Sequence, residues 1–150
     1  MKPERAVFIE LSAVLTGFSV IELEGTGMTD RYLQVVQDKT RPDTLAAFIR
    51  VAAQLLQEGA TDAARLHALI AVHLFDKDLF DGLAQNITFM WYSGQWVPTP
   101  RDAGVSLAQQ RNISADAYVQ GLMWKTAFAH PPGARQPGYG SWAQRPIGIR

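Results

Sequence analysis

The chain has 150 residues, a formal net charge of zero at neutral pH and 47% hydrophobic residues. That length suits one domain with a sizeable core, and the charge balance gives no overall electrostatic case for binding nucleic acid or an anionic membrane. The absence of cysteine excludes disulfides, thiol nucleophiles and cysteine-ligated metal sites, and no run of about 18 apolar residues predicts a membrane span.

Apolar residues recur at helical spacing along most of the chain, and no convincing alternating run predicts a strand. Three helices are expected to end at glycines, namely Gly17, Gly59 and Gly94. We expect residues 24–27 to form a loop, and we expect Leu79 to lie on the apolar side of the fifth helix. The expected helices cover roughly residues 8–16, 28–36, 44–58, 61–74, 79–93 and 114–125. The prediction is an all-α single domain of five to six helices, whose core contains Leu11, Leu15, Phe48, Leu69, Leu83, Ile87 and Trp91.

The last twenty residues differ in composition from the rest of the chain. Eight of the twenty are proline or glycine, which favours neither helix nor strand. Residues 117–150 contain four basic and no acidic residues, whereas residues 1–116 carry a net charge of −4. We therefore divide the chain into a helical domain, 1–130, and an extended docking tail, 131–150. The tail is expected to lie across a surface, either of its own helices or of another protein.

No set of residues typical of a catalytic or metal site assembles in the sequence. His67 and His73 are six residues apart and therefore lie on different faces of one helix. The acidic residues from Asp76 to Asp81 lack the glycine and glutamate of a calcium loop, and Gly25 and Gly27 follow no strand, as a dinucleotide-binding motif would require. We expect no catalytic residue, bound cofactor or metal in this chain.

The distribution of aromatic residues is the remaining indication of function, because all four tryptophans lie after residue 90. Aromatic side chains on irregular segments are typical anchors of protein interfaces. The predicted partner-binding residues are Trp91, Tyr92, Trp96, Pro137, Tyr139, Trp142 and Arg145.

Three short motifs, in this order, resemble a known family. They are Leu-Ser-Ala-Val-Leu-Thr-Gly at 11–17, Trp-Tyr-Ser-Gly at 91–94 and Pro-Gly-Tyr-Gly-Ser-Trp at 137–142. Together they make the whole chain resemble the small subunit of membrane-bound, FAD-containing sorbitol, fructose and glucose dehydrogenases. Each motif alone is weak, and their order is what makes the resemblance moderately specific.

The resemblance implies a non-catalytic accessory subunit. A separate flavoprotein of the glucose–methanol–choline type would hold FAD and oxidise the sugar or polyol, and a multihaem cytochrome c subunit would carry electrons to the membrane. The small subunit would support folding and export of the large one, which implies a periplasmic, membrane-associated complex. Because no twin-arginine motif follows Met1, a cytoplasmic location stays the alternative. The competing hypothesis is a stand-alone helical adaptor or ligand-binding domain.

Truncation after His130 tests the role of the tail. Ordering a segment costs about 1–2 kcal/mol per residue in backbone entropy, so the tail needs a surface to lie on. We expect the truncated chain to fold but to lose its large subunit in co-purification. Unchanged affinity would show that the tail is not the docking element, and failure to fold would favour packing of the tail on its own helices.

Overall fold

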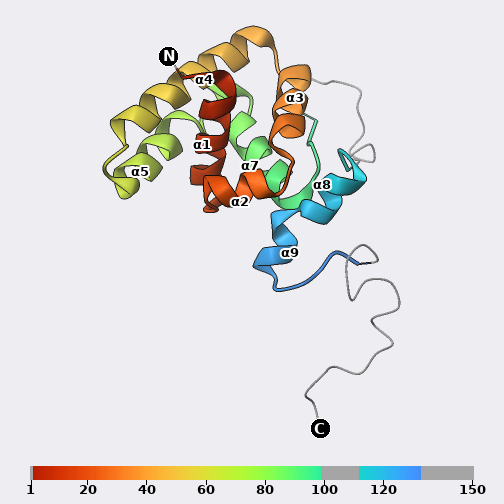
Figure 1. Ribbon diagram of the computed structural model, residues 1–150. Coiled ribbons are helices and arrows are strands. Elements are labelled where there is room, and N and C mark those ends of the chain that lie inside the picture. The colour runs from red at the N-terminus through yellow and green to blue at the C-terminus, as the bar shows by residue number, and fades with distance from the viewer. Residues whose placement is uncertain (1, 99–111, 133–150) are drawn as a thin grey trace.

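The computed structural model describes residues 2–98 and 112–132, without the side chains of Lys77 and Asp78. Within these residues the fold is all-α, as predicted, with one isolated antiparallel bridge between Gln95 and Asn112 (Figure 1). The helices are α1 (Glu4–Thr16), α2 (Val20–Gly25), α3 (Thr29–Lys39), α4 (Pro42–Glu58), α5 (Ala63–His73), α6 (Lys77–Phe80), α7 (Leu83–Ser93), α8 (Ala115–Gln120) and α9 (Leu122–Thr126). The predicted tail beyond Pro132 lies outside the described residues.

Several predicted helix ends are confirmed. Gly17 ends α1 and Gly94 ends α7, each with a φ in the left-handed region (79° and 71°) that glycine adopts without steric cost. Two predicted starts are shifted. The first residue of α4 is Pro42, whose fixed φ suits the first turn, and the side chain of Asp62, not Thr61, accepts the capping hydrogen bond of α5 from the backbone of Arg65.

Three features of the fold differ from the prediction. The last expected helix, 114–125, is divided at Gly121 into α8 and α9. Helix α2 runs into the segment expected to be a loop, and it is opened by a capping box in which Ser19 and Glu22 bond each other's backbone. The fifth expected helix is divided into α6 and α7 by left-handed residues at Asp81 and Gly82. This break changes the helix phase, so that Leu79 is 61% exposed although we expected it on the apolar side.

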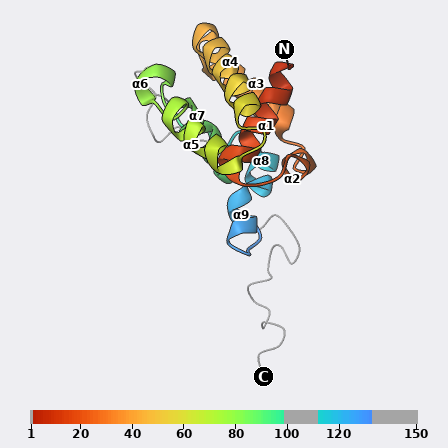
Figure 2. The same ribbon diagram turned by 90° about the vertical axis from the view of Figure 1, so that its left-hand side faces the viewer.

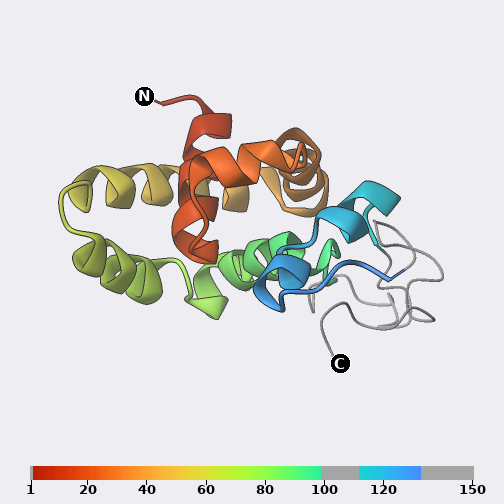
Figure 3. The same ribbon diagram turned by 60° about the horizontal axis from the view of Figure 1, so that its bottom comes forward.

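The core is built around α1, which packs against α2, α3, α4 and α7. Figure 3 shows α1 crossing the middle of the molecule, with α5 (yellow-green) at one end and α8 (cyan) at the other. The indole of Trp91 lies between α1 and α3. Its centroid is 6.4 Å from that of Phe8, in a stacked arrangement, and 4.8 Å from that of Tyr32, edge to face. Such aromatic pairs add to the stabilisation that burial alone gives.

Most of the predicted core is confirmed. Leu11, Phe48, Leu83, Ile87 and Trp91 are each at most 4% exposed. Leu15 and Leu69 are only half-buried, although both pack against the core cluster. The helical period predicted the direction of each side chain, whereas the depth of burial depends on neighbouring helices.

Replacing Leu83 by alanine should lower the free energy of unfolding by about 2–5 kcal/mol, because the side chain leaves a cavity among buried neighbours. Denaturant titration of the purified chain measures this loss. Leu79→Ala is the matched control, since its side chain lies in solvent, and it should change the free energy by less than about 0.5 kcal/mol. Equal losses for the two variants would contradict the assignment of Leu83 to the core.

Candidate protein-binding surfaces

The predicted partner-binding residues of the helical domain lie at the junction of α7 with the following segment. Trp91 is 1% exposed and Trp96 is 8% exposed, so both indoles pack within this chain. Tyr92 is half-buried, and its hydroxyl donates a 2.8 Å hydrogen bond to the carbonyl oxygen of Thr16. The other four predicted residues, Pro137, Tyr139, Trp142 and Arg145, lie outside the described residues.

The hydrogen bond from Tyr92 joins two of the motifs found in the sequence. Thr16 belongs to the motif at 11–17, where its hydroxyl also donates to the carbonyl of Ser12. Tyr92 belongs to the motif at 91–94, and its ring packs edge to face on Phe18 at 6.3 Å. Residues that are 76 positions apart therefore meet in the fold, which gives both motifs a structural role.

Gly94 and Gly121 allow the chain after α7 to pack closely on α8 and α9. A Cβ at Gly94 would collide with the carbonyl oxygen of Ala117, and one at Gly121 would lie 2.8 Å from the carbonyl oxygen of Tyr92. Because both contacts involve backbone atoms, no side chain can be accommodated without shifting the helices. These two glycines set the position of α8 and α9 against α7.

A set of exposed apolar side chains occurs along the segment from α5 to α7, whose helices lie to the left of α1 in Figure 2. We call it the α5–α7 apolar face, and it consists of Val72 (70% exposed), Phe75 (37%), Leu79 (61%) and Phe89 (41%). The side chain of Gln85 donates a 3.2 Å hydrogen bond to the carbonyl oxygen of Phe75 and thereby joins the end of α5 to α7. Gln85 and Phe89 are one helical turn apart on α7, so their side chains are neighbours.

Helix α5 is unusual because it is apolar on nearly every side. Among its residues only Ile70 is buried, while two leucines are half-buried and Val72 is open to solvent. A helix that is hydrophobic all round normally lies inside a larger structure. Its exposed polar residues are Arg65, His67 and His73, and no acidic residue occurs between Asp62 and Asp76.

The sequence prediction missed this face, although a signal for it was present. The apolar residues of 63–75 exceed the number that one buried stripe of a helix needs. Leu79 was placed on the wrong side because the break at Asp81 and Gly82 was not foreseen.

A cleft of about 430 Å³ separates α2 from α8 and α9. Phe18 and Thr26 line one wall, and Val119, Leu122 and Trp124 line the other. His130 and Pro131 also line the cleft, and the buried Nδ1 atom of His130 has no hydrogen-bond partner among the described residues.

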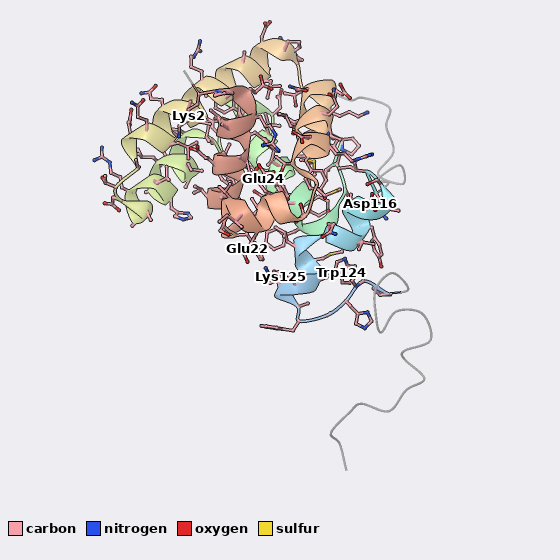
Figure 4. The ribbon with its side chains drawn as sticks, in the orientation of Figure 1. Lys2, Glu22, Glu24, Asp116, Trp124 and Lys125 are labelled. Carbon is pink, nitrogen blue, oxygen red and sulfur yellow. The ribbon has the colours of Figure 1, made fainter. Side chains whose placement is uncertain are left out.

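An ion pair crosses this cleft. Lys125 Nζ on α9 lies 2.6 Å from Glu22 Oε1 on α2, and it also lies 5.1 Å from the centroid of the Phe18 ring (Figure 4). The hydrogen bond from Lys125, followed by those from Ser19, lowers the pKa of Glu22 to about 2. The Glu22 carboxyl is therefore ionised over the neutral pH range, and the exposed pair adds a surface contact between α2 and α9.

A second ion-pair group joins α1 to α2 and α3. Arg5 donates to Glu24 at 2.7 Å and to Asp30 at 2.6 Å, and these bonds raise the pKa of Arg5 and lower the pKa of both carboxyl groups. Since these side chains are largely exposed, we assign them to the stability of the surface and not to a site.

Within residues 2–98 and 112–132, no group of three His, Cys, Asp or Glu side chains could hold a metal ion. No helix in the described part of the chain is long and apolar enough to cross a membrane. Comparison of the chain with protein-family models, curated proteins and solved structures finds no match.

The ion pair predicts a pH dependence with a definite sign. Because the pKa of Glu22 is lower in the folded chain than its ordinary value of 4.5, the stability that it contributes is complete above pH 4.5 and is lost as the pH falls through about 2. NMR titration of the Glu22 carboxyl measures the midpoint. In Lys125→Met the midpoint should rise part of the way toward 4.5, since the bonds from Ser19 remain. An unchanged midpoint would show that Lys125 is not the main cause.

Proposed function

We propose that this chain is the non-catalytic small subunit of an FAD-dependent sugar or polyol dehydrogenase complex. In this role it stabilises the large flavoprotein subunit, of the glucose–methanol–choline type, and assists its maturation or export. The α5–α7 apolar face supports a protein partner, because exposed apolar patches mark surfaces that bind other proteins, and the three sequence motifs supply the identity of that partner.

The energetics of the face favour a permanent partner. Burying a large aliphatic or aromatic side chain fully contributes about 1.5–3 kcal/mol. Within the described residues Val72 and Leu79 lack most of this gain, and Phe75 and Phe89 lack a smaller part of it. Interfaces of obligate complexes resemble a domain core divided between two chains. Helix α5 has only one buried residue among its many apolar residues, so it resembles the part of such a divided core that the small subunit would contribute.

The exposed polar residues of α5 favour a partner surface that offers carboxylates as hydrogen-bond acceptors. Arg65, His67 and His73 are exposed on α5, and the helix carries no acidic side chain. Carboxylates at the edge of the partner's apolar surface would complement these groups and orient the two chains.

In the proposed complex the redox groups belong to the partners. FAD lies in the large subunit, and haem lies in a multihaem cytochrome c subunit where one is present. The complex is membrane-associated in the periplasm, with a cytoplasmic location as the alternative. The large subunit selects the sugar or polyol.

A second candidate function has one observation in its favour. The cleft between α2 and α9 is large enough for a small molecule and has apolar walls beside the unpartnered Nδ1 of His130. A stand-alone ligand-binding domain would be monodisperse and well ordered when expressed alone. An obligate subunit would aggregate, or would become ordered only with its partner.

Replacing Val72 by aspartate tests the proposed function through the α5–α7 apolar face. In co-expression with a large flavoprotein subunit of the glucose–methanol–choline type, Val72→Asp should weaken the complex at least tenfold, about 1.4 kcal/mol or more, because a charge would be buried in an apolar interface. Ala46→Asp adds the same charge to the exposed side of α4 and should bind normally. Equal binding by both variants would show that the α5–α7 apolar face is not part of the interface.

The isolated chain should bind no FAD and should oxidise no sugar with an artificial electron acceptor, since the proposal places both functions in the large subunit. Bound flavin absorbs light between roughly 350 and 500 nm, so the absorbance of the purified chain in this range measures it directly. Stoichiometric flavin in this preparation would contradict the assignment as an accessory subunit.

A further inference from the structure

The cleft between α2 and the pair α8 and α9 has the size of a small-molecule site. Its volume of about 430 Å³ lies within the range of about 300–1,000 Å³ that is typical of ligand pockets. The lining residues come from two segments that are distant in the chain, 18–26 and 119–131. The chemistry of this lining indicates which molecules the cleft can hold.

The charges of the lining are already paired within the chain. Lys125 Nζ lies 2.6 Å from Glu22 Oε1, and Glu22 Oε2 accepts hydrogen bonds from the backbone N–H and the hydroxyl of Ser19 (Figure 4). No other acidic, lysine or arginine side chain lines the cleft among the described residues. A charged ligand would therefore find no unpaired counter-charge to offset its removal from water. The cleft favours an uncharged molecule.

Most of the remaining lining is apolar. Its apolar side chains are those of Phe18, Val119, Leu122, Trp124, Ala129 and Pro131. The indole N–H of Trp124 already donates to the carbonyl oxygen of Tyr118 at 2.8 Å, and the hydroxyl of Thr26 already donates to the carbonyl oxygen of Leu23 at 2.7 Å. Trp124 therefore offers the cleft the apolar surface of its ring, which suits a ligand with an apolar body.

Two polar groups of the lining are not used by the chain itself. The half-buried carboxamide of Gln120 and the Nδ1 atom of His130 make no hydrogen bond within the described residues. A carboxamide both donates and accepts, so Gln120 can bond a hydroxyl, a carbonyl or an amide group. A few polar groups among apolar walls are what orients a ligand in a pocket.

We propose that this cleft binds an uncharged small molecule with a largely apolar body and one hydroxyl, carbonyl or amide group. The inference goes beyond the proposed function and does not depend on the identity of the protein partner. None of the residues that line the cleft belongs to the α5–α7 apolar face. A ligand in contact with both walls joins α2 to α8 and α9, so its binding stabilises the folded chain.

A matched pair of fluorescent probes tests the ligand class. Phenylnaphthylamine is uncharged, and anilinonaphthalene sulfonate adds one negative charge to the same ring system. Both probes fluoresce more strongly in apolar surroundings, so titration of the full chain measures the dissociation constant of each. We expect phenylnaphthylamine to bind at least tenfold more tightly than the sulfonate, because the lining has no free positive charge. Equal or tighter binding of the sulfonate, or no binding of phenylnaphthylamine, would overturn the inference.

Replacing Gly25 by tryptophan tests whether the probe lies in the cleft. Gly25 lines the cleft, and a Cβ at this position would meet no atom within 4 Å, so a large side chain has room there. Gly25→Trp should weaken the binding of phenylnaphthylamine at least tenfold without lowering the melting temperature, since tryptophan favours a helix more than glycine does. Ala46→Trp adds the same side chain to the exposed side of α4 and should leave probe binding unchanged.

Two more variants make the result decisive. If Gly25→Trp does not fold, Val119→Trp fills the cleft from the opposite wall and should weaken binding in the same way. Val72→Asp reports on the α5–α7 apolar face. If Val72→Asp abolishes probe binding while the folded cleft variant retains it, the probe lies on that face and the inference is overturned, although the proposed function stands. If the probe binds in the cleft but the chain does not bind a large flavoprotein subunit, only the proposed function fails.

Discussion

The fold depends on the packing of the Trp91 indole between α1 and α3. Its contacts with Phe8 and Tyr32 join helices from the beginning, the first third and the middle of the chain. Burial raises the pKa of the Tyr32 hydroxyl, which therefore stays neutral inside the core. Because α1 also packs on α2 and α4, the positions of the other helices follow from this contact.

The region after α7 depends on a second constraint, the close approach of backbone to backbone. Gly94 lies against Ala117 and Gly121 lies against Tyr92, while the side chain of Asn86 holds both the N–H and the carbonyl of Val97. These contacts explain why Trp96 is buried although it follows the helix, since the chain is bound back onto α7. They also direct α9 toward α2, where Lys125 and Glu22 meet.

Large apolar side chains of the described residues are open to solvent in three places: along α5–α7, at Ile21 on α2 and at Phe128 after α9. On the α5–α7 apolar face, α5 has more apolar residues than the described part of the chain covers. At the turn after α9, one phenylalanine occupies a position better suited to glycine. Neither feature is compensated by a contact within the described residues.

The sequence by itself determined the all-α class, the ends of α1 and α7, and the burial of Leu11, Phe48 and Ile87, because helical period and left-handed glycine are local properties of the chain. The capping box of Ser19 and Glu22 was also predictable from the spacing of these two residues, although the sequence prediction did not include it. Only the tertiary structure decided that Trp96 is buried, that Leu79 and Val72 are exposed, and that Tyr92 meets Thr16. These outcomes depend on which helices pack together and at what depth, and no periodicity within one helix specifies its neighbours.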